Sequence, residues 1–237
     1  MTQCSADDLP RRIGELLDKA TCCQSDGRFG DADLLIADAR RLATGNVQAC
    51  AEIELFCATA LLEHGNRDQG LKALASMLAR YGEWLKTAEG RAVYERVQVQ
   101  RAFSLMHFQK HLEAQPLLEE ATQFQIDAQV RSDVYCHLGR CYCELSLYTL
   151  AREQFERAHA LGVSEDWQPA FHYYYGYTLY ELKEFQRAKR EFILCLQSGP
   201  SGPEPGLRYS MLAATSRKLG EYSEAKTYEG RAKKLKL

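Results

Sequence analysis

The sequence lacks any long hydrophobic run and any strong excess of one charge. No stretch approaches the roughly eighteen consecutive apolar residues that cross a bilayer. The first residues, MTQCSADDLPRR, contain neither the apolar core nor the cleavage site of a secretory signal. The formal net charge is −2 at pH 7, without the basic excess that nucleic-acid-binding proteins usually concentrate on one face. We therefore expect a cytoplasmic protein with no membrane partner and no nucleic-acid partner.

Sequence patterns that mark common active sites and metal sites are also missing. The chain contains no GxSxG, HExxH or Walker pattern and no CxxC pair. In the segment CHLGRCYC, Cys136 and Cys143 lie two helical turns apart, about 10 Å along the axis, which is too far for one tetrahedral zinc ion. We therefore expect no enzyme activity and no catalytic residue, and neither a cofactor nor a metal.

Cysteine, in contrast, is plentiful. The chain has nine cysteines among 237 residues, and an odd number within helical patterns does not favour a disulfide framework. The simplest interpretation is a set of reduced thiols that act as small hydrophobic side chains in a reducing compartment. A redox-active thiol at Cys143, which would lie near Arg140, stays open as an alternative.

A pattern of large and small side chains recurs along the chain. In its clearest copy, the residues on the inner faces of two successive helices are Tyr135, Leu138, Gly139, Tyr142, Ala151, Phe155 and Ala158. Similar residues return 37 positions later, and again after another 37. The small residue that opens the second helix recurs as Ala32, Gly70, Ala114, Ala151, Ala188 and Ala225. A glycine or alanine where two helices cross lets their backbones approach, and the large residue opposite fills the gap.

This order of residues resembles the tetratricopeptide repeat, and the resemblance covers nearly the whole chain in about six copies. It implies an all-α protein, a right-handed α-solenoid of stacked antiparallel helix pairs. No shift of composition marks an internal boundary, so we expect a single superhelical domain over residues 1–237. Its approximate repeats are 13–46, 51–84, 95–128, 132–165, 169–202 and 206–237.

The segment HYYYGYTLYEL, residues 172–182, carries five tyrosines. Tyr175 falls in a core position of the repeat. In the family that the chain resembles, the first helices of successive pairs line a concave face, and aromatic and arginine side chains are common binding anchors. The resemblance therefore implies a partner groove whose residues are Phe103, Met106, Cys136, Arg140, Cys143, Tyr173, Tyr177, Tyr180 and Arg217.

These features favour a non-enzymatic scaffold or adaptor for protein–protein interaction, which binds a protein or peptide segment of unknown identity in its concave aromatic groove. The first alternative is a homo-oligomerising structural subunit of a larger complex, with contacts made by the last helix or by the insertion around Trp84. The second is a helical repeat that binds RNA, which the acidic balance of the chain disfavours.

Overall fold

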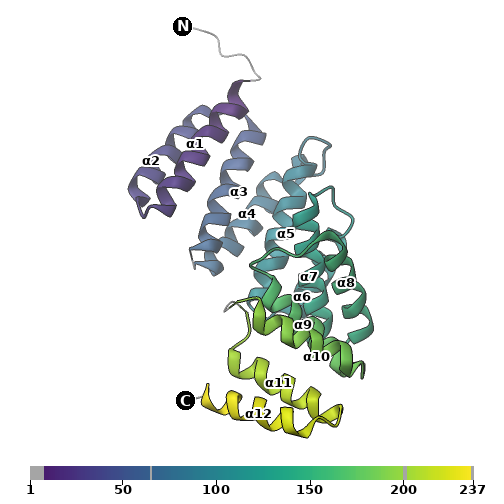
Figure 1. Ribbon diagram of the computed structural model, residues 1–237. Helices are drawn as coiled ribbons and strands as arrows, with labels where there is room; N and C mark the ends of the chain where they lie inside the picture. Colours follow the sequence, from purple (N-terminus) through teal and green to yellow (C-terminus); the bar gives the residue numbers. More distant parts are fainter. Residues whose placement is uncertain (1–7, 65, 200–201, 236–237) are drawn as a thin grey trace. The chain divides into compact units, whose positions relative to one another are not determined.

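The computed structural model describes residues 8–64, 66–199 and 202–235 (Figure 1). These residues form twelve α-helices and no β-strand. The helices are α1 (Asp8–Ser25), α2 (Phe29–Leu42), α3 (Val47–Glu63), α4 (Arg67–Leu85), α5 (Arg91–His107), α6 (His111–Ala121), α7 (Ala128–Glu144), α8 (Tyr148–Leu161), α9 (Gln168–Glu181), α10 (Phe185–Gln197), α11 (Pro205–Lys218) and α12 (Tyr222–Lys234). The prediction of an all-α protein is therefore confirmed.

The described residues divide after Ser104 into two compact units. In the first unit, α1 packs against α2 and α3 packs against α4. In the second unit, the pairs α7–α8, α9–α10 and α11–α12 pack in the same way, and each pair also packs against the next through α8–α9 and α10–α11. The predicted single domain and its repeat boundaries stay predictions, and the first seven and last two residues of that domain lie outside the described residues.

The turns within successive helix pairs share one backbone conformation. In five of these turns a residue stands in the left-handed region of φ, namely Gly27, Gln109, Ser146, Lys183 and Gly220, and the last four are spaced by 37. The sixth turn, between α3 and α4, includes residue 65, which lies outside the described residues. In the five turns, the amide of the left-handed residue donates to the carbonyl three positions back, and the next amide donates to the carbonyl five positions back. This is the Schellman arrangement, which satisfies the last carbonyls of the first helix. The repeat is therefore visible in the backbone as well as in the side chains.

The small residues of the repeat lie where the two helices of a pair meet. All six residues that open the second helices are buried, namely Ala32, Gly70, Ala114, Ala151, Ala188 and Ala225. A β-carbon added to Gly139 would stand 2.8 Å from the ring of Phe155, and one added to Gly176 would stand 3.0 Å from the ring of Phe192. These contacts confirm the predicted crossing, in which glycine makes room for a phenylalanine ring.

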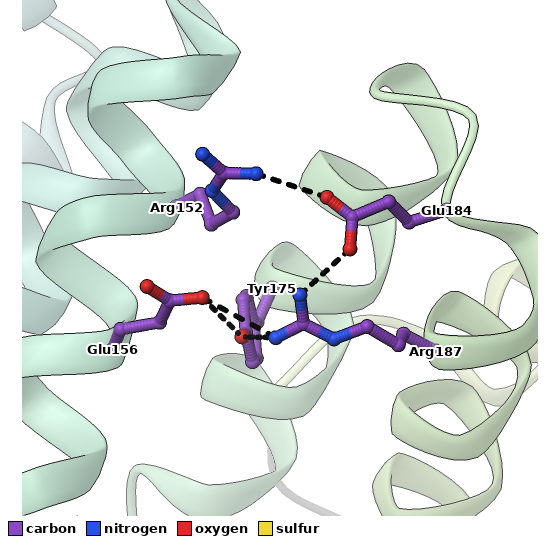
Figure 2. Close-up of polar contacts among 5 residues, drawn as sticks. All are labelled: Arg152, Glu156, Tyr175, Glu184 and Arg187. Carbon is purple, nitrogen blue, oxygen red and sulfur yellow. Dashed lines mark hydrogen bonds and ion pairs between the residues drawn. The ribbon is translucent and has the colours of Figure 1, made fainter.

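Ion pairs join successive repeats at the second helices. Arg152 of α8 donates to Glu184, which precedes α10, at 3.0 Å, and Lys189 of α10 donates to Glu221, which precedes α12, at 2.6 Å. Both residues of the second pair stand 37 positions after those of the first. Around the first pair, the hydroxyl of Tyr175 donates to a Glu156 carboxylate and accepts from the Arg187 guanidinium (Figure 2). The Tyr175 ring is buried against Phe155 and Phe171, as its predicted core position requires.

Arg208 of α11 is hydrogen-bonded to main-chain oxygens at the end of α10 and just before α11. Its guanidinium is only 2% exposed and donates to the carbonyl oxygens of Pro203, Cys195 and Gly199, at 2.6, 3.1 and 2.7 Å. A buried charge is tolerated only when such bonds replace its lost hydration. The clamp therefore holds Pro203 and the start of α11 beside the cleft described next.

Candidate functional site

An open cleft of about 640 Å³ lies in the second unit, formed by α7, the turn into α8, α9 and the start of α11. Its volume falls within the usual range for ligand-binding pockets. The residues that line it are Arg140, Cys143, Glu144, Ser146, Tyr148, Ala170, Tyr173, Tyr174, Tyr177, Gly202, Pro203 and Leu207. Four tyrosines, one cation and one carboxylate thus face the same space.

The tyrosines are held by contacts among rings. Tyr173 and Tyr177 lie one helical turn apart on α9, so both point to the same side of the helix. The ring of Tyr173 is nearly buried and meets Phe192 edge to face, with centroids 6.0 Å apart. The ring of Tyr177 meets that of Tyr148 with centroids 6.2 Å apart and planes at 68°. Tyr173 is therefore a fixed wall, while Tyr148 and Tyr177 form a partly exposed pair.

Arg140 lies on the aromatic surface rather than in an ion pair. Its guanidinium carbon stands 5.0 Å from the centroid of the Tyr174 ring, within the range of a cation–π contact. Its Nε is buried and has no hydrogen-bond partner among the described residues. Arg140 therefore lies beside a tyrosine ring of the cleft.

The tyrosine hydroxyl groups of the cleft are neutral. Burial raises the pKa values of Tyr173, Tyr174 and Tyr177, and a hydrogen bond with Tyr148 and the charge of Glu181 raise that of Tyr177 further. Their hydroxyl groups therefore stay protonated near pH 7 and can donate hydrogen bonds. The cleft therefore presents neutral hydroxyl groups beside aromatic rings.

Cys143 does not have the environment of a reactive thiol. Burial raises its pKa to about 12, the carboxylates of Glu144 and Glu181 raise it, and a hydrogen bond with Thr178 and the charge of Arg140 oppose them. Reactive cysteines have a lowered pKa and an exposed sulfur atom. The geometry therefore gives no support to the alternative of a redox-active thiol at this position.

The structure brings together four of the nine predicted groove residues, Arg140, Cys143, Tyr173 and Tyr177. Met106 of α5 and Cys136 of α7 are completely buried and contribute to the core. Their positions turn both side chains toward neighbouring parts of the protein. The half-buried Tyr180 packs on the ring of Phe185, with centroids 5.5 Å apart, and does not line the cleft. The partner groove as a whole stays a prediction.

The other two predicted residues lie elsewhere. Arg217 of α11 is ion-paired with Glu229 of α12 and lines a separate hollow of about 320 Å³ beside Ser210 and Ala214. Phe103 is half-buried in α5 and belongs to the first unit. The cleft therefore contains only four of the nine residues predicted for the groove.

Sequence reasoning missed Tyr148, Tyr174, Glu144 and the rim formed by Pro203 and Leu207. Tyr148 opens α8 directly after a turn, and its ring reaches Tyr177 of α9. Tyr174 stands three residues before Tyr177, and this spacing places two side chains on one helical face. That spacing was the signal that could have found Tyr174, whereas the rim depends on how the α10–α11 loop folds.

Among residues 8–64, 66–199 and 202–235, no three His, Cys, Asp or Glu side chains are grouped in a way that could hold a metal ion. Within the same ranges, no helix combines the length and apolar character needed to span a bilayer.

Comparison with known proteins connects the chain to solved structures. No protein-family model matches the sequence, and no curated protein matches it. The structure from the functional characterization of Pseudomonas aeruginosa pilF is similar at a TM-score of 0.72 and 17% identity, over 96% of this chain and 93% of that one. A tetratricopeptide repeat protein from Parabacteroides merdae is similar at a TM-score of 0.61 and 14% identity, over 95% and 80%. MamA from Desulfovibrio magneticus RS-1 gives a TM-score of 0.60 and 12% identity, over 81% and 96%.

The packing of helix pairs, the recurrent turn and the buried glycine or alanine at each crossing define a helical repeat protein. With the similarity to solved repeat structures, they identify the fold. The chain has the tetratricopeptide-repeat fold, an all-α array of stacked antiparallel helix pairs.

Proposed function

We propose that the protein is a non-enzymatic scaffold that binds a segment of a partner protein in the cleft between α7, α9 and α11. The observation that carries this proposal is the cleft itself, with Tyr148, Tyr174 and Tyr177 accessible in a space of about 640 Å³. Tyrosine provides a large contact area with little rotamer entropy to lose, and it is enriched at binding hot spots. The proposed setting is the cytoplasm, which fractionation of the native cell would test.

The shape and chemistry of the cleft suit a peptide better than a small reactive molecule. The walls are rigid, because Tyr173 packs on Phe192 and the α11 rim is held by Arg208. The tyrosine hydroxyls can donate hydrogen bonds to main-chain carbonyl oxygens of an extended or helical segment. We therefore propose that the tyrosine rings contact side chains of the partner, and that the tyrosine hydroxyl groups donate hydrogen bonds to its backbone.

Photo-cross-linking in the native cell tests this proposal. A photo-reactive phenylalanine analogue is placed at Tyr174, and in a control protein at Gln186, an exposed residue of α10 that does not line the cleft. We expect a defined protein to be cross-linked from position 174 and not from position 186. Equal cross-linking from both positions, or none from position 174 under conditions where the control protein is folded and expressed, would contradict the assignment.

The alternative of a homo-oligomerising subunit has a specific observation in its favour. Two large side chains at the ends of α12 and beyond are exposed, Tyr222 at 72% and Leu235 at 53%, and paired copies could bury them. Light scattering on the purified protein separates the two functions. If the protein is a monomer at high concentration, the homo-oligomer hypothesis is wrong. The proposal that the cleft binds a partner segment is then unaffected.

A further inference from the structure

One end of the cleft combines aromatic rings with carboxylates. Tyr148 and Tyr177 meet edge to face at 68°, and both rings are partly exposed and line the cleft. Glu144 lines the cleft at the end of α7. Glu181 stands 37 residues later, at the end of α9, and so occupies the same place in the next repeat. Neither carboxylate has an ion-pair partner among the described residues.

The charges at this end do not cancel. Glu144 and Glu181 both act on the Cys143 thiol between them, where each raises its pKa. The basic residue that lines the cleft is Arg140, and its guanidinium is already stacked on Tyr174. No cation of the described residues lies over the ring of Tyr148 or Tyr177 in a comparable way. Glu144 thus lines the cleft together with these rings, whose faces are electron-rich. Glu181 is not among the lining residues, but it lies close enough to Tyr177 for its charge to raise the pKa of that hydroxyl.

We infer that the Tyr148–Tyr177 end of the cleft binds the side chain of a lysine or arginine in the partner segment. The inference rests on the proposed function, because it names the chemistry of the partner at the same cleft. The cation lies against the ring faces of Tyr148 and Tyr177 and donates hydrogen bonds to Glu144 and Glu181. Cation–π contacts and charge-assisted hydrogen bonds reinforce each other when they share a partly desolvated site.

The probe is a displayed library of random twelve-residue peptides, selected on the full-length protein. We expect the enriched peptides to share a lysine or arginine at one aligned position, and we measure the affinity of the most enriched one. Replacing that residue by glutamine should weaken binding roughly tenfold, equivalent to one desolvated charge contact.

A double-mutant cycle then locates the contact. Glu144→Gln and Glu181→Gln together keep the shape of the cleft and remove both charges, and they should weaken the parent peptide roughly tenfold. The glutamine peptide should bind this double variant and the natural protein equally, because the contact is already absent. The matched control is Glu153→Gln with Glu165→Gln, two exposed carboxylates outside the cleft, which should leave both affinities unchanged.

The outcomes separate this inference from the proposed function. Enriched peptides without a conserved cation, or with a conserved acidic residue, would overturn the cation site and leave the peptide-binding function standing. A cation preference that survives the Glu144 and Glu181 changes would also overturn it, since the contact would lie elsewhere. Failure of every peptide, together with no cross-link from position 174, would count against the function and the inference alike.

Discussion

At the scale of single residues, glycine is required where a helix crossing leaves no space for a β-carbon. Gly139 and Gly176 are such positions, and each faces a buried phenylalanine ring. Gly230 of α12 is different, because a β-carbon added there would meet no atom within 4 Å. Glycine inside a helix is otherwise unfavourable relative to alanine.

The two kinds of glycine should respond oppositely to the same change. Gly139→Ala should lower the free energy of unfolding by about 1–3 kcal/mol, because the Phe155 ring must move in a close-packed core. Gly230→Ala should raise it by about 0.5–1 kcal/mol, the difference in helix propensity. Urea unfolding followed by circular dichroism measures both. Equal effects of the two substitutions would show that the contact with Phe155 does not limit the packing.

At the scale of structural elements, the turn within a helix pair requires a backbone conformation that is unfavourable for any residue except glycine. Gln109, Ser146 and Lys183 have φ values of 60°, 60° and 64°, in a region that costs a residue with a β-carbon about 1–2 kcal/mol. Gly220 occupies the same place in the last pair without that cost. The repeat tolerates non-glycine residues there because the two turn hydrogen bonds hold the conformation.

A reciprocal exchange tests this account of the turn. Ser146→Gly should stabilise the protein by up to about 1 kcal/mol, and Gly220→Ser should destabilise it by about 1 kcal/mol. Thermal unfolding of the two variants and of the natural protein shows whether each substitution stabilises or destabilises the fold. Stabilisation by Gly220→Ser would mean that the left-handed conformation is not the one the turn adopts in solution.

The ion pairs between repeats make the stability of the fold depend on pH. Burial alone would raise the pKa of Glu184, but hydrogen bonds from Arg187 and Arg152 outweigh it, so the pKa lies below its ordinary value (Figure 2). A carboxyl group with a lowered folded-state pKa stabilises the fold above its unfolded pKa and loses this effect as pH falls through the folded pKa.

The contribution of Glu184 should therefore vanish in acid. Glu184→Gln should lower the free energy of unfolding by about 0.5–1 kcal/mol at pH 7. At a pH well below the ordinary carboxyl pKa of about 4.3, the variant and the natural protein should be equally stable. Glu153→Gln, an exposed residue of α8 outside the ion-pair network drawn in Figure 2, is the control and should show no such dependence. If the difference in the free energy of unfolding persisted in acid, the shape of the Glu184 side chain, rather than its charge, would be what stabilises the fold.

At the scale of the whole molecule, the sequence predicts the helix pairs well because their determinants are local. A small residue must recur wherever two helices cross, so Ala151, Ala188 and Ala225 could be found by their spacing, and all three are buried. The first two copies follow the same rule, since Ala32 and Gly70 are also buried. Lys19, which occupies a slot that is usually apolar, is exposed instead, while its neighbour Ala20 is buried.

The cleft was harder to predict because it depends on single-residue differences around a helix. Tyr173 and Tyr174 are adjacent, yet the first packs on Phe192 and the second carries Arg140 on its ring. A shift of one position turns a side chain by about 100°, which decides between core and surface. The rim at Pro203 depends on the hydrogen bonds of Arg208 to the carbonyl oxygens of Pro203 and Cys195, which no periodicity reveals.

Hydroxyl-radical footprinting of tyrosine side chains, with and without the partner captured from position 174, tests the central claim most directly. We predict that bound partner protects Tyr148, Tyr174 and Tyr177 from oxidation, while Tyr222, which is 72% exposed on α12, reacts as before. Protection of Tyr222 with unchanged reactivity of the three cleft tyrosines would contradict the account.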